Sequence, residues 1–420
     1  MVKNVKDVAY FCIITSLLGA TTISVDLVFF QFSLFRITFL ILMIFTFVIL
    51  WVRNDKFTIN KKNSQSYSIM FFIFWFFYSI ITIAWVEDYA SWIQDLYFIG
   101  LATFLIISFS YIFNNVNDIL VGFRLFSIMS IFHIIIGIYE IFTNNYFFLN
   151  EDRVPIYSVY DHPVSIFNNT NNYATFITFA IFTLAICFKN TSSFIAKLIY
   201  VVFIFLSVYT LIMTSSRANI IGLVIGIVVF FIITIFIQRK AKVLYGLMVL
   251  ILMIFAVSSV FISDIVEYLT NNLTFDFSAE TGSIYIRENL YKNALIFLFE
   301  TFGFGTGTGN LEYWMMNYST FQTDSVLAVH NWWIEILSTY GVLTFLLYVI
   351  FYYKLVKDLI INIVKSKNEV ITSISIGLLC IMSSFTINSL SSSTLISSEW
   401  MWVFWAIIIS FQGLTYEERR

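Results

Sequence analysis

About a dozen apolar runs divide this chain, and most can cross a hydrocarbon layer of about 30 Å as a helix of about 20 residues. Helices are expected because a span in lipid must satisfy its own backbone N–H and C=O groups. The runs lie near 8–24, 33–52, 68–86, 93–112, 119–141, 172–190, 196–214, 218–237, 243–263, 331–353, 370–388 and 399–413. The pattern predicts an all-α polytopic membrane bundle of about twelve transmembrane helices, with residues 1–420 as a single integral membrane domain.

The composition excludes a water-soluble globular protein. Of the 420 residues, 60% are hydrophobic and 11% are charged, against roughly 25% charged in a soluble domain. The 49 Phe and 10 Trp cannot all be buried in a soluble chain of this length, whereas a bilayer allows the outer surface to be apolar too. Cys12, Cys187 and Cys380 each lie in an apolar run, so we expect small hydrophobic residues and no disulfide or metal framework.

The lysines and arginines set the expected orientation, because cytoplasmic loops are enriched in them. With the N-terminus in the cytoplasm, most of the 23 Lys and Arg residues fall in cytoplasmic segments. Arg153, Arg217, Arg287 and Lys292 fall on the outer side. An even number of spans then places both termini in the cytoplasm. Because the cytoplasmic loops are short and basic, we expect the chemistry at the outer face.

Two loops on the outer side are much longer than the others, near 142–171 and 264–330. The second lies between the ninth and tenth predicted spans. An amphipathic helix is predicted within it over 283–300, since apolar residues recur there at helical spacing between charged ones. This helix is expected either to lie at the membrane interface or to pack over the mouth of the bundle.

Arg217 is a candidate for chemistry because charge beside the hydrocarbon layer is unfavourable and is usually retained for function or pairing. It lies in the segment Thr214-Ser215-Ser216-Arg217, between two spans with almost no loop. A guanidinium stays protonated and can hold a phosphate through two hydrogen bonds. The alternative role is an interfacial anchor that reaches lipid headgroups.

His330 begins the segment His330-Asn331-Trp332-Trp333-Ile334-Glu335, where the long outer loop enters a span. An imidazole titrates near neutral pH and can accept a proton from a hydroxyl nucleophile. Glu335 does not share a helical face with His330, so no direct pair between them is expected. The alternative is a structural histidine whose hydrogen bonds are satisfied.

The glycine-rich run over 303–309 is predicted to be a tight turn that re-enters the bundle. A phosphate-binding loop is excluded because no Lys-Ser/Thr follows and no buried strand precedes it. The sequence also contains no Asp-x-Asp pair, so a nucleotide-sugar site built on a divalent metal is not supported. We therefore expect no metal and no cofactor.

Four of these segments together resemble the O-antigen ligase and repeat-unit polymerase superfamily of bacterial envelope polysaccharide enzymes. The most specific part is His330-Asn331 followed by Glu335 and Gly341, which is similar to the family pattern His-Asn-x-x-x-Glu-x-x-x-x-x-Gly. The other parts are Thr214 to Arg217, Arg287 through Gly303, Gly305 and Gly307, and Asn169-Thr170-Asn171 with Ala174. The resemblance covers about 167–345. Thr170, Thr301 and Tyr291 depart from the family's usual Pro, Pro and Trp, which puts loop geometry in doubt more than chemistry.

The resemblance implies a metal-independent membrane glycosyltransferase of the C-type architecture in the bacterial cytoplasmic membrane. Its donor would be an oligosaccharide linked to a polyprenyl diphosphate at the outer leaflet. His330 would activate the acceptor hydroxyl, with inversion at the anomeric carbon. Arg217 and Arg287 would stabilise the leaving diphosphate as fixed charges.

The candidate supporting residues are Arg36, Glu140, Asn331 and Glu335. Arg36 is expected to face the same cavity or to pair with Asp26. Glu140 is expected to orient an arginine. For both Arg36 and Glu140 the favoured alternative is a structural ion pair.

The expected function is polymerisation of lipid-linked repeat units into a capsular polysaccharide or exopolysaccharide. The motifs do not separate polymerases from ligases, which transfer a finished glycan to another acceptor. A sequence rich in Phe, Ile and Asn suggests an AT-rich genome and a bacterium without an outer membrane, which favours a polymerase. A lipid-linked oligosaccharide transporter is an alternative of another class, but the asymmetric halves argue against internal repeats.

The expected partners are the polyprenyl-diphosphate-linked donor and acceptor and the membrane lipid. A flippase and a chain-length regulator are further candidate partners, and no nucleic acid is expected. A purely structural envelope role would give no reason for His330, Arg217 and Arg287 to share one face.

Overall fold

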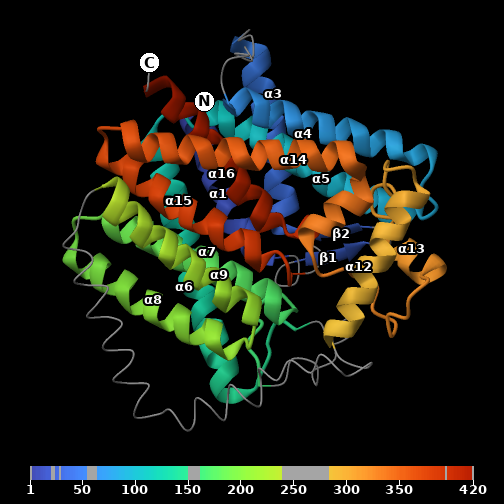
Figure 1. Ribbon diagram of the computed structural model, residues 1–420. Coiled ribbons are helices and arrows are strands. Elements are labelled where there is room, and N and C mark those ends of the chain that lie inside the picture. The colour runs from blue at the N-terminus through green and yellow to red at the C-terminus, as the bar shows by residue number, and fades with distance from the viewer. Residues whose placement is uncertain are drawn as a thin grey trace.

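The computed structural model describes residues 2–19, 24–27, 30–53, 64–149, 161–238, 283–392 and 395–418, and its helices pack side by side as a bundle (Figure 1). In chain order the elements are α1 Val2–Ser16, β1 Ser24–Leu27, β2 Phe30–Ser33, α3 Leu34–Arg53, α4 Ser64–Ile81, η1 Thr82–Ala84, α5 Tyr89–Ile112, α6 Val116–Thr143, α7 Thr170–Lys189, α8 Phe194–Met213, α9 Arg217–Ile232, the π-helix η3 Ile233–Ile237, α12 Ser283–Glu300, α13 Leu311–Tyr318, α14 Trp332–Lys365, α15 Glu369–Asn388, η4 Leu395–Ser397 and α16 Glu399–Glu418. Among these described residues, nine helices are long and apolar enough to cross a membrane. The prediction of a polytopic helical membrane protein is confirmed.

Three of the predicted spans differ from this set. The run near 8–24 corresponds to α1, which ends at Ser16, and the chain forms an antiparallel hairpin of β1 and β2 from Ser24 onward. Apolar and polar residues alternate there, a period of two that favours strands, so this short segment adds a hairpin to the otherwise helical bundle. The run near 243–263 lies outside the described residues. The run near 399–413 corresponds to α16, which is not among the nine.

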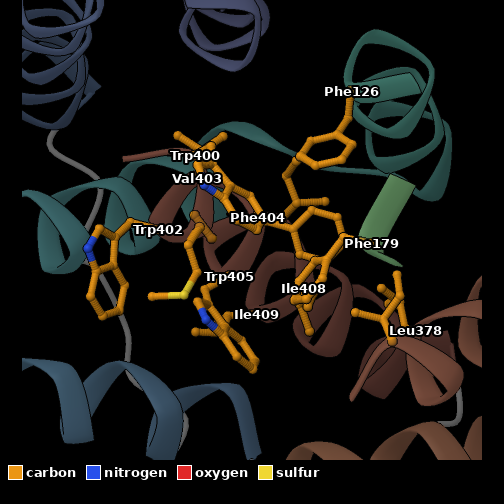
Figure 2. Packing of buried hydrophobic residues seen from close by; sticks show 14 of the residues in the cluster. Phe126, Phe179, Leu378, Trp400, Trp402, Val403, Phe404, Trp405, Ile408 and Ile409 are labelled. Carbon is orange, nitrogen blue, oxygen red and sulfur yellow. The ribbon is translucent and has the colours of Figure 1, made fainter. Parts of the chain in front are cut away.

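Helix α16 occupies the centre of the bundle, and its residues from 400 to 413 are all buried. Figure 2 shows aromatic side chains around it, and the Phe404 ring centroid lies 5.0 Å from those of both Phe126 and Phe179. Because protein surrounds it, α16 can carry polar residues that a lipid-facing helix could not. The Gln412 amide donates to the Asp358 carboxylate at 2.7 Å. The last predicted span is therefore a core helix.

Helix α14 is broken at Gly341, where the backbone has φ 78° and ψ 175°. The glycine-rich turn packs into this break, as three hydrogen bonds show. They are Thr306 N to Ser338 O at 2.8 Å, Gly307 N to Thr339 O at 3.0 Å and Val342 N to Gly303 O at 2.9 Å. The turn thus satisfies carbonyl groups that the broken helix leaves open. The prediction of a tight turn that re-enters the bundle is confirmed.

Helices α12 and α13 lie beside the first part of α14, on the right in Figure 1. The predicted amphipathic helix is confirmed, since α12 spans Ser283–Glu300. Its Leu290, Ala294 and Phe297 are fully buried in a small separate core with Leu311 and Val329. Its apolar face therefore packs on protein, on α13 and on the segment that leads into α14.

Candidate active site

His330 lies just before α14, which begins at Trp332. Its φ of +52° is a left-handed conformation that is uncommon for a residue other than glycine. Its Nδ1 atom is buried and has no hydrogen-bond partner within the described ranges. Burial, and then the positive charge of Arg287, lower the pKa of His330 from 6.5 to about 4. The imidazole is therefore neutral at pH 7, and a ring nitrogen that carries no proton can accept one.

Asn331 is the N-cap residue of α14, and its side-chain oxygen is used in hydrogen bonds to the backbone of that helix. Its side-chain oxygen accepts hydrogen bonds from the backbone N–H groups of Trp333 at 3.1 Å and Ile334 at 3.3 Å. This is the N-cap arrangement, which satisfies N–H groups that have no partner within the helix. The predicted supporting role of Asn331 is thus one of positioning, because the cap fixes the residue that follows His330.

Arg287 lies on α12 and is half-buried. Its effect on the pKa of His330 shows that its charge lies near the imidazole. Helix α12 therefore brings one of the two predicted phosphate-binding arginines to the predicted base, although the two residues are far apart in the sequence.

Arg217 is the first residue of α9, and its side chain is exposed. The segment just before it is fixed by a hydrogen bond from the Ser216 hydroxyl to the Asn171 side-chain oxygen at 2.6 Å. Asn219 donates to the Asn171 carbonyl at 3.3 Å and to the Ser391 hydroxyl at 3.5 Å. This network joins α7, α9 and the segment after α15.

The same segment after α15 also reaches the start of α14, since Trp332 N donates to Ser389 O at 2.9 Å. Arg217 and His330 are therefore at the same end of the bundle, linked through the network on Ser391 and Ser389. Asn169 contributes from α7 as its N-cap, accepting from two backbone N–H groups. The separate motif segments meet at one end of the molecule.

Among the described residues Glu140 contacts no arginine, so neither the expected orientation of an arginine nor the alternative ion pair is seen there. One of its carboxylate oxygens accepts hydrogen bonds from the backbone N–H groups of Val164 at 2.9 Å and Ser165 at 2.8 Å. The other oxygen is buried without a hydrogen-bond partner in the described part of the chain. A buried carboxylate can satisfy two backbone donors at once, so Glu140 ties the outer loop to α6.

Arg36 forms a structural ion pair, as its favoured alternative stated, but its partner is Glu399. The Arg36 Nε atom lies 3.0 Å from Glu399 Oε1, and the side chains are 12% and 7% exposed. The Arg36 guanidinium also lies over the Tyr97 ring, 5.3 Å from its centroid. The pair joins α3 to the core helix α16, while the side chain of Asp26 lies outside the described part.

Glu335 lines a cavity of about 150 Å³ that opens beside the start of α14. Asp95 of α5 and Glu312 of α13 line the same cavity. No group of three or more His, Cys, Asp or Glu residues in the described ranges could hold a metal ion. Burial raises the pKa of Glu312, which lies outside the spans. This acidic cavity thus brings three carboxyl groups together, and Glu335 is near the other two and not paired with His330.

Our reading of the sequence missed Asp95 and Glu312. Asp95 is an acidic residue within an apolar run of α5, and an ionisable residue within a span is by itself a functional signal. Glu312 gives no comparable signal, because acidic residues are ordinary in an outer loop. Only the packing of α13 against the bundle brings it to the cavity.

Comparison with known proteins gives two matches. Residues 202–349 match a family model described as O-antigen ligase. The chain is also 27% identical over 357 residues to the teichuronic acid biosynthesis protein TuaE of Bacillus subtilis strain 168, covering 84% of this chain and 72% of that protein. The range that matches the family model contains Arg217, Arg287, His330 and Gly341. Both matches agree with the resemblance seen in the motifs.

Proposed function

Because these two matches support an O-antigen ligase-like family for this chain, we propose that it is a membrane glycosyltransferase of envelope polysaccharide biosynthesis. It joins polyprenyl-diphosphate-linked oligosaccharide repeat units into a capsular polysaccharide or exopolysaccharide. The reaction takes place at the outer face of the bacterial cytoplasmic membrane, with both chain termini in the cytoplasm. The observation that carries this proposal is the neutral His330, with a partnerless Nδ1 within the described ranges, close to the cationic Arg287.

In the proposed reaction, His330 removes the proton from an acceptor hydroxyl. The hydroxyl oxygen forms a bond to the anomeric carbon of the donor sugar as the bond from that carbon to the diphosphate oxygen breaks. Direct displacement inverts the configuration at this carbon. A base with a pKa near 4 is unprotonated at neutral pH, so it is ready to accept the proton, although it is a weaker base than an ordinary histidine.

The leaving group is a lipid diphosphate, which gains negative charge as the glycosidic bond breaks. Arg217 and Arg287 stabilise this charge, since preorganised cations act more strongly in a site with little water. Arg217 is exposed at the N-terminus of α9, where the helix dipole also favours an anion. The lipid tail remains in the outer leaflet throughout.

A ligase is the second candidate, favoured by the description of the matching family model. A ligase uses the same donor, base and arginines, and only its acceptor differs. A flippase and a chain-length regulator are the proposed partners of the polymerase.

The test is an assay of the purified full-length chain in lipid nanodiscs with polyprenyl-diphosphate-linked repeat units, followed by gel electrophoresis. A ladder of products is expected for the wild type. The His330→Ala variant should lose the ladder, while the control His162→Asn should retain it, because His162 is another outer-side histidine, bonded to the Met213 carbonyl. Arg287→Gln should lower the rate by about 10²-fold or more, and Lys292→Gln, on the same helix, should change it little.

The outcomes separate the candidates. Transfer of a single glycan to an added foreign acceptor, without a ladder, establishes the ligase. Transport of the lipid-linked sugar across a vesicle bilayer without any transfer establishes a transporter. A correctly inserted His330→Ala variant with near-normal polymer formation overturns the proposed mechanism.

A further inference from the structure

The acidic cavity next to α14 is not used by the proposed chemistry. Its three carboxylates, Asp95, Glu312 and Glu335, come from three different helices. Across the described ranges, none of the three accepts a hydrogen bond or pairs with a cation. Asp95 and Glu335 are half-buried, and carboxylates in such positions usually have hydrogen-bond or cationic partners. Their partners are therefore expected to come from a bound molecule.

A second observation also points to a ligand. Tyr340 lines the same cavity and is only 2% exposed, and no hydrogen bond joins its hydroxyl to the part of the chain that the structure describes. Asp95 and Glu335 line the cavity together with Tyr340 and act on it electrostatically. Its ring is held by an edge-on contact with Trp75, at 5.2 Å between centroids. A buried tyrosine hydroxyl normally finds a partner.

The cavity is adjacent to the proposed base. Val329, the neighbour of His330 in the chain, lines it. Arg287 acts on His330 from α12, whereas the three carboxylates lie together around the cavity. His330 is therefore one residue along the chain from the cavity wall, and Arg287 acts on it from α12.

We propose that this cavity is the acceptor subsite and binds the hydroxyl groups of the terminal, non-reducing sugar of the acceptor glycan. This proposal rests on the proposed function and adds the position and chemistry of the second substrate. Sugar hydroxyls donate hydrogen bonds, and carboxylates are their strong acceptors. A cavity of about 150 Å³ can admit one six-membered ring, so it matches a single pyranose.

The residues that line the cavity argue against the reverse assignment. They include three carboxyl groups and no lysine or arginine among the described lining residues, so a lipid diphosphate would find no cation there to stabilise its charge. The donor therefore binds on the side of Arg217 and Arg287. The acceptor sugar enters from the other side of His330, is uncharged, and presents its hydroxyl to the imidazole.

The test uses the repeat-unit oligosaccharide as its octyl glycoside, which has no diphosphate and acts only as an acceptor. Its KM is measured at a fixed concentration of the lipid-linked donor, and the KM of the donor is measured separately. Asp95→Asn and Glu335→Gln should each raise the acceptor KM by about ten- to a hundred-fold and leave the donor KM unchanged. Tyr340→Phe keeps the ring and should raise the acceptor KM less.

Controls keep this test decisive. Glu369→Gln, at the opposite end of the bundle on α15, should change neither KM. Glu312 lies on the exposed helix α13, so Glu312→Gln gives a second measurement if a variant in a span fails to insert. Calorimetric titration of the wild type with the octyl glycoside, without donor, should show binding that Glu335→Gln weakens.

The results distinguish this proposal from the proposed function. An unchanged acceptor KM in Asp95→Asn, Glu312→Gln and Glu335→Gln, with transfer still dependent on His330, overturns the acceptor subsite alone. A raised donor KM in the same variants also overturns it. If wild-type protein transfers no sugar but still binds the octyl glycoside at the acidic cavity, the proposed function fails while the sugar site stands.

Discussion

Gly341 is expected to be the most sensitive glycine of the break in α14, and Gly341→Ala tests how the break is maintained. Its φ of 78° and ψ of 175° are a conformation adopted almost only by glycine, which costs another residue about 1–3 kcal/mol. A Cβ atom at this position would also lie 2.4 Å from Gly303 O and 2.5 Å from Phe304 O. The glycine-rich turn would have to move away, and the bond from Val342 N to Gly303 O would weaken by about 1 kcal/mol.

The expected loss for Gly341→Ala is therefore about 3 kcal/mol, the sum of backbone strain and the weakened turn contact. Gly303→Ala is the matched control. Gly303 has a similar φ of 81°, but an added Cβ would meet only the Val342 side chain, at an ordinary 3.5 Å. Gly303→Ala should therefore lower stability only by the cost of the backbone strain, about 1–2 kcal/mol.

The assay is thermal unfolding in detergent, followed by intrinsic tryptophan fluorescence. At roughly 1 °C per kcal/mol for a chain of 420 residues, Gly341→Ala should lower the melting temperature by about 3 °C and Gly303→Ala by roughly half as much. Equal shifts in melting temperature, or a larger shift for Gly303→Ala, would refute the argument that the glycine-rich turn, packed against Gly341, stabilises the break in α14.

Three further perturbations test the site and its supports. The kcat/KM of the wild type should hold as the pH falls from 7 and decline only near the His330 pKa of about 4; Arg287→Gln removes a charge that opposes protonation, so its acid limb should move to higher pH. Glu140→Ala should expose the segment that contains Val164 and Ser165 to limited proteolysis and lower stability by about 2–4 kcal/mol, since two buried backbone N–H groups lose their acceptor, whereas Glu140→Gln keeps an acceptor oxygen and should cost less. Arg36→Met should destabilise by about 3–5 kcal/mol because it leaves Glu399 buried and unpaired, and adding Glu399→Gln should restore part of that loss in a double-mutant cycle.

Local patterns predicted the elements that depend on neighbours in the sequence. The predicted helix over 283–300 agrees with α12 at both ends. Apolar residues at helical spacing predict such a helix because they give it one face that can be buried. The tight glycine turn was also predictable, since only glycine readily adopts the positive φ at Gly305 and Gly307.

Features that depend on tertiary contacts were not predictable in this way. The run near 399–413 has the length of a span, yet whether lipid or protein surrounds α16 depends on helices far away in the sequence. The acidic cavity has the same origin, because Asp95 and Glu335 come together only when α5 packs beside α14. Arg36 was correctly expected in an ion pair, but its partner on α16 could not be read from sequence spacing.

Several residues of the recognised motifs lie at helix termini or at the break in α14. Asn169 and Asn331 are N-caps of α7 and α14, and Gly341 lets α14 break where the glycine-rich turn enters. These residues satisfy or release backbone groups that a helix terminus leaves open. His330 differs, because its buried Nδ1 has no partner among the described residues, and so it remains available to a substrate. In these motifs the asparagines and glycines therefore determine where the ends of the helices meet, and in the proposed mechanism the histidine and arginines supply the chemistry at that meeting point.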